Sequence, residues 1–169
     1  EGSLVNEILK VRRAGATIDE ALAATAEVRR NHTCLFMVDD LEALSRGGRI
    51  PSTVASVGSV LDVKPMLSIG DDGKLTMCGV SRGRKKGIKS LCNNVAKSLG
   101  DEGQEKVTIY VAHSDCPDDA EKLKELVCKT APKAKVLIAN IGPVIGSHVG
   151  PDMLAVSFVK PSAAQMKVM

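Results

Sequence analysis

The sequence has no tryptophan, one tyrosine and two phenylalanines among its 169 residues. So few aromatic rings argue against a protein that stacks nucleic-acid bases, because such proteins use aromatic side chains as stacking platforms. Its five cysteines are odd in number and form no CxxC pair, which argues against a disulfide framework or a zinc site and favours a reducing compartment. Glycines and prolines interrupt the uncharged segment 140–151, so we predict no membrane-spanning helix.

The charge and composition are those of an ordinary globular domain with one local basic cluster. Hydrophobic residues make up 44% and charged residues 25% of the chain, and the formal net charge is +3. Five cations follow one another without an acid: Arg82, Arg84, Lys85, Lys86 and Lys89. Without them, 23 − 5 = 18 basic residues face 20 acidic ones, so the rest of the chain sums to −2. This distribution favours a single docking patch over general nucleic-acid coating.

Hydrophobic periodicity predicts a mixed sheet with helices packed against it, which is an α/β fold. Thr17 and Glu20 form a capping box, Asp39 and Asp40 can cap a brief helix that Gly47-Gly48 ends, and Pro51 can begin another helix. Asp-Gly between two apolar runs predicts a hairpin. The predicted strands are 33–38, 65–69, 74–80, 107–112, 135–141 and 154–159. The predicted helices cover residues 4–11, 18–28, 88–99 and 117–127, as well as the brief one after Asp40 and the one from Pro51.

Two segments besides the basic cluster could carry chemistry. The first, 142–151, places Ser147 and His148 among three glycines and two prolines between two predicted strands, and we interpret it as a tight loop. Its histidine could equally bond only to the backbone. The second, 45–51, offers Arg49 as a planar fork for a carboxylate or phosphate, with Gly47-Gly48 able to aim N–H groups. The alternative there is an ordinary helix end followed by a solvated arginine.

Residue types found in enzymes do not assemble into a recognisable catalyst. His113-Ser114-Asp115 contains the residue types of a catalytic triad, but triad members converge in space and are not sequence neighbours. Helix capping explains Asp39 and Asp40 more simply than a cation site does. The sequence therefore predicts no catalytic residue, no metal and no cofactor.

Five motifs in register make the chain resemble the DegV family of bacterial fatty-acid-binding proteins, from about Ser3 to Val159. They are Phe36-Met37-Val38-Asp39-Asp40-Leu41-Glu42, Gly47-Gly48-Arg49-Ile50, Lys64-Pro65, Arg82-Gly83-Arg84-Lys85-Lys86 and the segment 141–151. Family members have two domains, and the Ser/Thr-rich motif of the N-terminal one is not found here. The resemblance implies a helical connector over 1–31 and a C-terminal, two-layer α/β domain with a six-stranded mixed sheet over 32–169.

The resemblance also implies a function and its residues. His148 and Arg49 would hold the carboxylate of a long-chain fatty acid, with Ser147 and Gly146 in the same segment, and the acyl chain would lie between this domain and the missing N-terminal one. Arg82, Arg84 and Lys85 would dock a kinase subunit that phosphorylates the bound fatty acid. The protein would be a cytoplasmic, non-catalytic carrier with at most peripheral membrane contact and no nucleic-acid partner.

One departure and two alternatives remain. Asp152 stands where the family usually has a small residue, and we expect it to face solvent. Proteins similar in fold bind dihydroxyacetone through a histidine, so one alternative is a phosphotransferase component that binds a small polar substrate through His148. The other is a nucleic-acid-binding module that uses the basic patch 82–89, which would show steep salt dependence.

Overall fold

The protein is described by a computed structural model that covers residues 1–39, 41–50, 62–70, 72–100, 104–105 and 107–161. The strands are β1 His32–Met37, β2 Val63–Ile69, β3 Leu75–Arg82, β4 Thr108–His113, β5 Lys135–Asn140 and β6 Leu154–Val159. The helices are α1 Gly2–Arg13, α2 Ile18–Arg30, α3 Glu42–Arg46, α5 Arg84–Leu99, α6 Pro117–Thr130 and α7 Pro143–Val149. Within these ranges, no helix has the length and apolar character needed to cross a bilayer.

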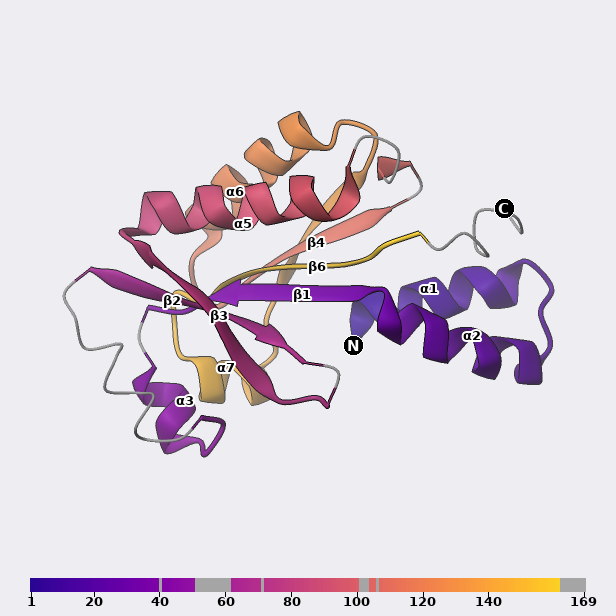
Figure 1. Cartoon of the computed structure of the whole chain (residues 1–169), viewed down its shortest axis with the longest axis horizontal. Coiled ribbons are helices and arrows are strands. Elements are labelled where there is room, and N and C mark those ends of the chain that lie inside the picture. The colour runs from indigo at the N-terminus through magenta and orange to yellow at the C-terminus, as the bar shows by residue number, and fades with distance from the viewer. Residues whose placement is uncertain (40, 51–61, 71, 101–103, 106, 162–169) are drawn as a thin grey trace.

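The six strands form one mixed sheet, which confirms the predicted α/β class. Their order is β3-β2-β1-β6-β4-β5. β4 and β5 are parallel and are joined through α6, whereas the other neighbours are antiparallel. β2 and β3 pair from Val63↔Arg82 to Ile69↔Leu75, as the predicted hairpin requires. Figure 1 shows α5 and α6 along one face of the sheet and α3 and α7 below the other.

Apolar side chains fill both faces of the sheet near its centre. In β1, Leu35 and Met37 point toward α5 and α6, whereas Phe36 joins the core under α3 and α7. Successive strand residues face opposite sides, so a strand buried on both sides is apolar without alternation. Ile88, Leu91 and Val95 of α5, together with Leu123 of α6, close the larger core.

Most predicted elements are present, with bounds that agree or are shifted by at most four residues. The capping box of α2 is confirmed, because the Thr17 side chain accepts from Glu20 N–H while the Glu20 carboxylate accepts from Thr17 N–H. The helix predicted from Pro51 lies outside the described residues. α2 ends at Arg30 and β1 begins at His32, so the boundary at residue 31 falls between two elements, and the two-part division stays a prediction.

Two local predictions were wrong. The segment 142–151 contains a short helix, α7, and is not only a tight loop, because Pro143 occupies the first turn of the helix and Gly150, with φ +75°, ends it. Asp39 does not cap α3, since the N-cap residue is Leu41, whose side chain forms no capping hydrogen bond, and Asp40 lies outside the described residues. Asp39 forms ion pairs with Lys64 and Arg84 instead.

A triangle of hydrogen bonds attaches α1 to the sheet. His32 Nε2 lies 2.9 Å from Ser157 Oγ and 3.1 Å from Ser3 Oγ, and the two serine hydroxyls are 3.0 Å apart. Ser3 is buried although it is polar. Buried polar groups require such partners, so these bonds stabilise α1 on β1 and β6.

This triangle predicts a loss of stability in mild acid. Burial lowers the pKa of His32 below its ordinary value, so the unfolded chain binds a proton more readily than the folded one. The contribution of His32 to the free energy of unfolding is therefore at its maximum above about pH 6.5. It decreases as the pH is lowered through the pKa of the folded state. Urea unfolding between about pH 7.5 and 5 measures this slope. His32→Gln should flatten it, and an unchanged slope in that variant would contradict the assignment.

Candidate functional site

Arg49 follows a helix end that fixes its backbone. α3 ends at Gly47, Gly48 has φ +66°, and the N–H groups of Gly48 and Arg49 donate to the carbonyls of Ser45 and Leu44 at 3.0 and 2.9 Å. This is the Schellman arrangement, in which a left-handed glycine allows the chain to turn back and satisfy the last helical carbonyls. The Gly47-Gly48 amides are thus used by the helix end and do not aim at a ligand.

His148 and Arg49 meet although they are 99 positions apart in the sequence. His148 lies in the last turn of α7, which packs against α3, and Arg49 Nη2 is 3.3 Å from His148 Nε2. A guanidinium only donates, so Nε2 accepts in this contact and the imidazole keeps an Nδ1–H donor. Arg49 is exposed and His148 is half-buried. Arg49 and His148, which the family resemblance paired, therefore lie side by side, and their role toward an anionic headgroup stays a prediction.

Gly47 determines how the imidazole sits. A Cβ atom added to Gly47 would lie 2.5 Å from His148 Nδ1, whereas a Cβ atom added to Gly48 would meet no atom within 4 Å. The close approach of α3 to α7 therefore depends on the absence of a side chain at residue 47.

Gly47→Ala should turn the His148 ring while leaving the fold nearly intact, because Gly47 has φ −75° and alanine adopts that conformation. The imidazole Hε1–Cε1 cross-peak in NMR should shift, and the melting temperature should barely change. Gly48→Ala is the matched control: it strains a left-handed residue by about 1 kcal/mol and lowers the melting temperature without crowding the ring. The reverse pattern would show that Gly47 does not contact His148.

The rest of α7 places the other predicted residues around His148. The Ser147 hydroxyl is exposed and donates to the Val144 carbonyl at 2.9 Å, one turn back in the same helix. Gly146 is half-buried. Val144 and Ile145 are 73% and 50% exposed, so two large apolar side chains stand uncovered on the helix that carries His148. Ligand roles for Ser147 and Gly146 stay predictions.

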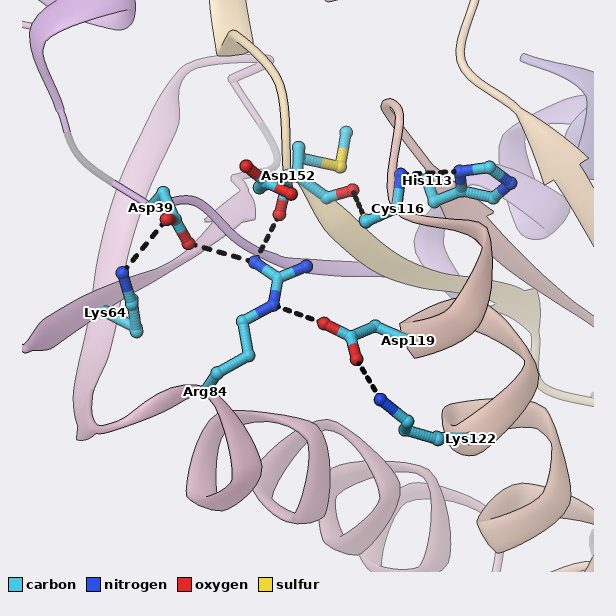
Figure 2. Close-up of polar contacts among 9 residues, drawn as sticks. Asp39, Lys64, Arg84, His113, Cys116, Asp119, Lys122 and Asp152 are labelled. Atoms are coloured by element: carbon cyan, nitrogen blue, oxygen red, sulfur yellow. Dashed lines mark hydrogen bonds and ion pairs between the residues drawn. The ribbon is translucent and has the colours of Figure 1, made fainter.

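The predicted docking cluster divides into outward and inward residues. Arg82 and Lys85 are exposed, whereas the Arg84 side chain is only 22% exposed and turns inward. Figure 2 shows Arg84 reaching from the start of α5 toward Asp39, Asp119 and the loop that contains Asp152. Cations at the N-terminus of a helix oppose its dipole, and here two carboxylates offset the charge of one of them.

Arg84 is the centre of a charge network that the sequence analysis missed. Its Nε donates to Asp119 Oδ2 at 2.7 Å, and its Nη1 donates to Asp39 Oδ1 at 3.0 Å and to the Asp152 carbonyl. Lys64 and Lys122 bind the second oxygens of Asp39 and Asp119 at 3.0 and 2.9 Å. Spacings of 35 to 68 residues give no local sequence signal for such a network.

The network also sets the ionisation of its members. Burial would raise the pKa of Asp119, but hydrogen bonds from Arg84 and Lys122 outweigh it and hold that pKa below its ordinary value. Asp152 is half-buried and has φ +61°, so the residue we expected to face solvent is partly covered.

The neighbouring cysteine and histidine are structural. Burial raises the pKa of the Cys116 thiol despite the nearby Arg84 charge, so this thiol is a poor nucleophile. His113 is buried, and its Nδ1 accepts from Cys116 N–H at 3.3 Å. Across the described ranges, no group of three or more His, Cys, Asp or Glu residues is placed to hold a metal ion.

Fold and site together define an α/β domain with a guanidinium and an imidazole paired where α3 and α7 pack against each other. Residues 1–161 match the sequence profile of the DegV family. A DegV domain-containing protein of Clostridium perfringens is 42% identical over 160 residues, covering 94% of this chain and 54% of that protein. One from Streptococcus pyogenes is 36% identical over 156 residues, covering 92% and 53%. The chain belongs to the DegV family and spans about half the length of these curated relatives.

Solved structures show the same fold. A fatty acid binding DegV family protein from Streptococcus agalactiae has a TM-score of 0.81 at 29% identity, covering 95% of this chain and 56% of that one. A DegV family protein from Thermus thermophilus, described for its fatty acid binding, has a TM-score of 0.82 at 28% identity, with coverages of 95% and 56%. The Streptococcus pneumoniae Fatty Acid Kinase (Fak) B3 protein, loaded with linoleic acid, has a TM-score of 0.83, but its 18% identity shows the fold alone, over 94% and 55%.

Proposed function

We propose that this chain is the C-terminal part of a fatty-acid carrier and that Arg49 and His148 hold the carboxylate of a long-chain fatty acid. The observation that carries the proposal is the 3.3 Å contact between Arg49 Nη2 and His148 Nε2. Hydrogen bonds from cationic donors to a carboxylate are short and strong, and a guanidinium matches carboxylate geometry. Relatives at 28–29% identity bind fatty acids, which agrees with this chemistry.

The surroundings of the pair suit an alkyl ligand. Val144 and Ile145 are exposed beside His148 on α7, and exposed large apolar side chains commonly mark a surface that another molecule covers. Curated relatives are about twice as long as this chain. We infer that a further part of the full-length protein, corresponding to the rest of those relatives, completes the ligand site and covers the acyl chain.

Fatty-acid binding to the native gene product that contains this chain tests the proposal. His148→Ala and Arg49→Ala should each weaken linoleate binding about tenfold to a hundredfold, the effect of removing a hydrogen bond to a charged group. The matched control is Arg46→Ala, because Arg46 lies in α3 close to Arg49 but pairs with Glu42. Unchanged affinity in both site variants would remove the pair from the site.

The second half of the proposal is that the carrier presents its ligand to a kinase and does no chemistry itself. Arg82 and Lys85 support this as exposed cations beside the inward-turned Arg84, since a local positive patch steers an acidic partner. Mass spectrometry of ligand extracted from the protein expressed in bacteria separates the alternatives. A retained long-chain acid is expected, whereas a covalent adduct on His148 would favour the phosphotransferase.

A further inference from the structure

We propose that Arg84 is a positioning residue of the Arg49–His148 site: it holds the chain segment that leads into α3 and the one that follows α7, and so fixes where both ligand-binding side chains stand. The inference rests on the proposed function, but the contacts of Arg84 from which it is argued do not depend on a ligand. Arg84 begins α5, which covers the opposite face of the sheet from α3 and α7 (Figure 1).

A single nitrogen of Arg84 binds both segments. Nη1 carries two hydrogens, and it donates one bond to Asp39 Oδ1 at 3.0 Å and another to the main-chain carbonyl of Asp152. Asp39 lies three residues before Glu42, where α3 begins, and Asp152 lies three residues after Val149, where α7 ends. Figure 2 shows both contacts converging on the guanidinium. Movement of Arg84 would therefore release the approach to Arg49 and the exit from His148 together.

On the α3 side, contacts hold the chain at Val38 and Asp39 and again at the end of α3. Lys64 holds the second oxygen of Asp39 at 3.0 Å, and Val38 N–H donates to the Pro65 carbonyl, so β2 supports the segment from one side and Arg84 from the other. Beyond α3, the Schellman turn fixes the backbone at Arg49. A shift at Asp39 would thus be carried along a short helix to the guanidinium that meets His148.

The α7 side needs support because its backbone is unfavourable. Gly150 has φ +75° and Asp152 has φ +61°, and the left-handed region is disfavoured for a residue with a side chain. Asp152 N–H donates to the Ser114 carbonyl at 2.7 Å, and the Asp152 carbonyl accepts from Arg84. The hydrogen bond from Arg84 Nη1 therefore helps to maintain the turn that follows α7, which ends at Val149, next to His148.

Arg84 is itself held firmly enough to act in this way. Its Nε donates to Asp119 Oδ2 at 2.7 Å, and the two side chains are only 22% and 19% exposed. Only the planar arginine fork can offer Nε to one helix and Nη1 to two loops at once, because a lysine ammonium is a single point. These three contacts also turn its charge away from solvent, which distinguishes Arg84 from the exposed Arg82 and Lys85.

The test compares Arg84→Met with Lys122→Met in the native gene product that contains this chain. Lys122 binds the same Asp119 carboxylate, at 2.9 Å, but contacts neither segment, so it controls for loss of an ion pair. We expect Arg84→Met to weaken linoleate binding about tenfold, a size typical of mutations within a coupled network, and Lys122→Met to change it less than about twofold. The His148 Hε1–Cε1 cross-peak, identified by its loss in His148→Ala, should shift without ligand in Arg84→Met alone.

Non-additivity distinguishes positioning from a general loss of stability. In a background that carries both Arg49→Ala and His148→Ala, Arg84→Met should weaken the remaining linoleate binding less than about twofold, because Arg84 then has neither side chain to position. A full tenfold loss in that background, or wild-type affinity with an unmoved cross-peak in Arg84→Met, would overturn the inference.

If Arg84→Met does not fold, Arg84→Lys keeps a cation between the carboxylates and should still shift the cross-peak; an unmoved peak would overturn the inference equally. Wild-type protein that binds no linoleate would refute the proposed function, while the cross-peak would still decide the role of Arg84.

Discussion

Phe158→Ala should lower the free energy of unfolding by about 3–5 kcal/mol, the usual cost of removing a buried aromatic ring. Phe158 is fully buried in β6 and joins the larger core beneath α5 and α6. The sheet lies on one side of the ring and two helices on the other, so neighbouring side chains can fill the cavity only in part. Urea unfolding followed by circular dichroism measures the change.

Ile18→Ala is the control for Phe158→Ala. Ile18 is 86% exposed at the start of α2, so its truncation should change the free energy of unfolding by less than about 0.5 kcal/mol. Comparable losses in the two variants would mean that Phe158 is not enclosed by the core, or that α2 is covered by another part of the protein.

Gly87→Ala should destabilise the protein by about 1–3 kcal/mol, the typical cost of overpacking. A methyl group on Gly87 would overlap Met37 Sδ, and Met37 is completely buried in β1. Methionine is flexible, but the surrounding core leaves its side chain little room to move. The sign of the change in the free energy of unfolding is informative. Without a clash, replacing glycine by alanine inside a helix stabilises the protein by about 0.5–1 kcal/mol.

A double-mutant cycle tests this contact directly. Gly87→Ala should cost much less in a Met37→Ala background, where the overlapping sulfur is absent. Gly79→Ala is the matched control, since its added methyl would meet no atom within 4 Å. Equal costs in both backgrounds would refute the contact. Gly87 also lies within one turn of Arg84, so displacement of α5 would move the residue that we propose positions the ligand site.

Local patterns predicted the elements well because short-range physics determines them. The Thr17–Glu20 capping box, the apolar spacing of α5 and the Asp-Gly turn between β2 and β3 each depend on residues close in sequence. α7 was misread because its glycines and prolines suggested a loop. Pro143 at the first turn and Gly150 after the last are a helix signature, and they could have been recognised as one.

The sequence determined the α/β class and, through its ordered motifs, the family, and it predicted Arg49 and His148 as ligand-binding residues. Their 3.3 Å contact, the exposed apolar side chains beside them and the inward turn of Arg84 were decided by the tertiary structure. Helix periods and caps depend on residues a few positions apart, so they can be read along the chain. Ion pairs such as Arg84–Asp39 and Arg84–Asp119 join residues 45 and 35 positions apart, and only the packing of the helices against the sheet brings them together.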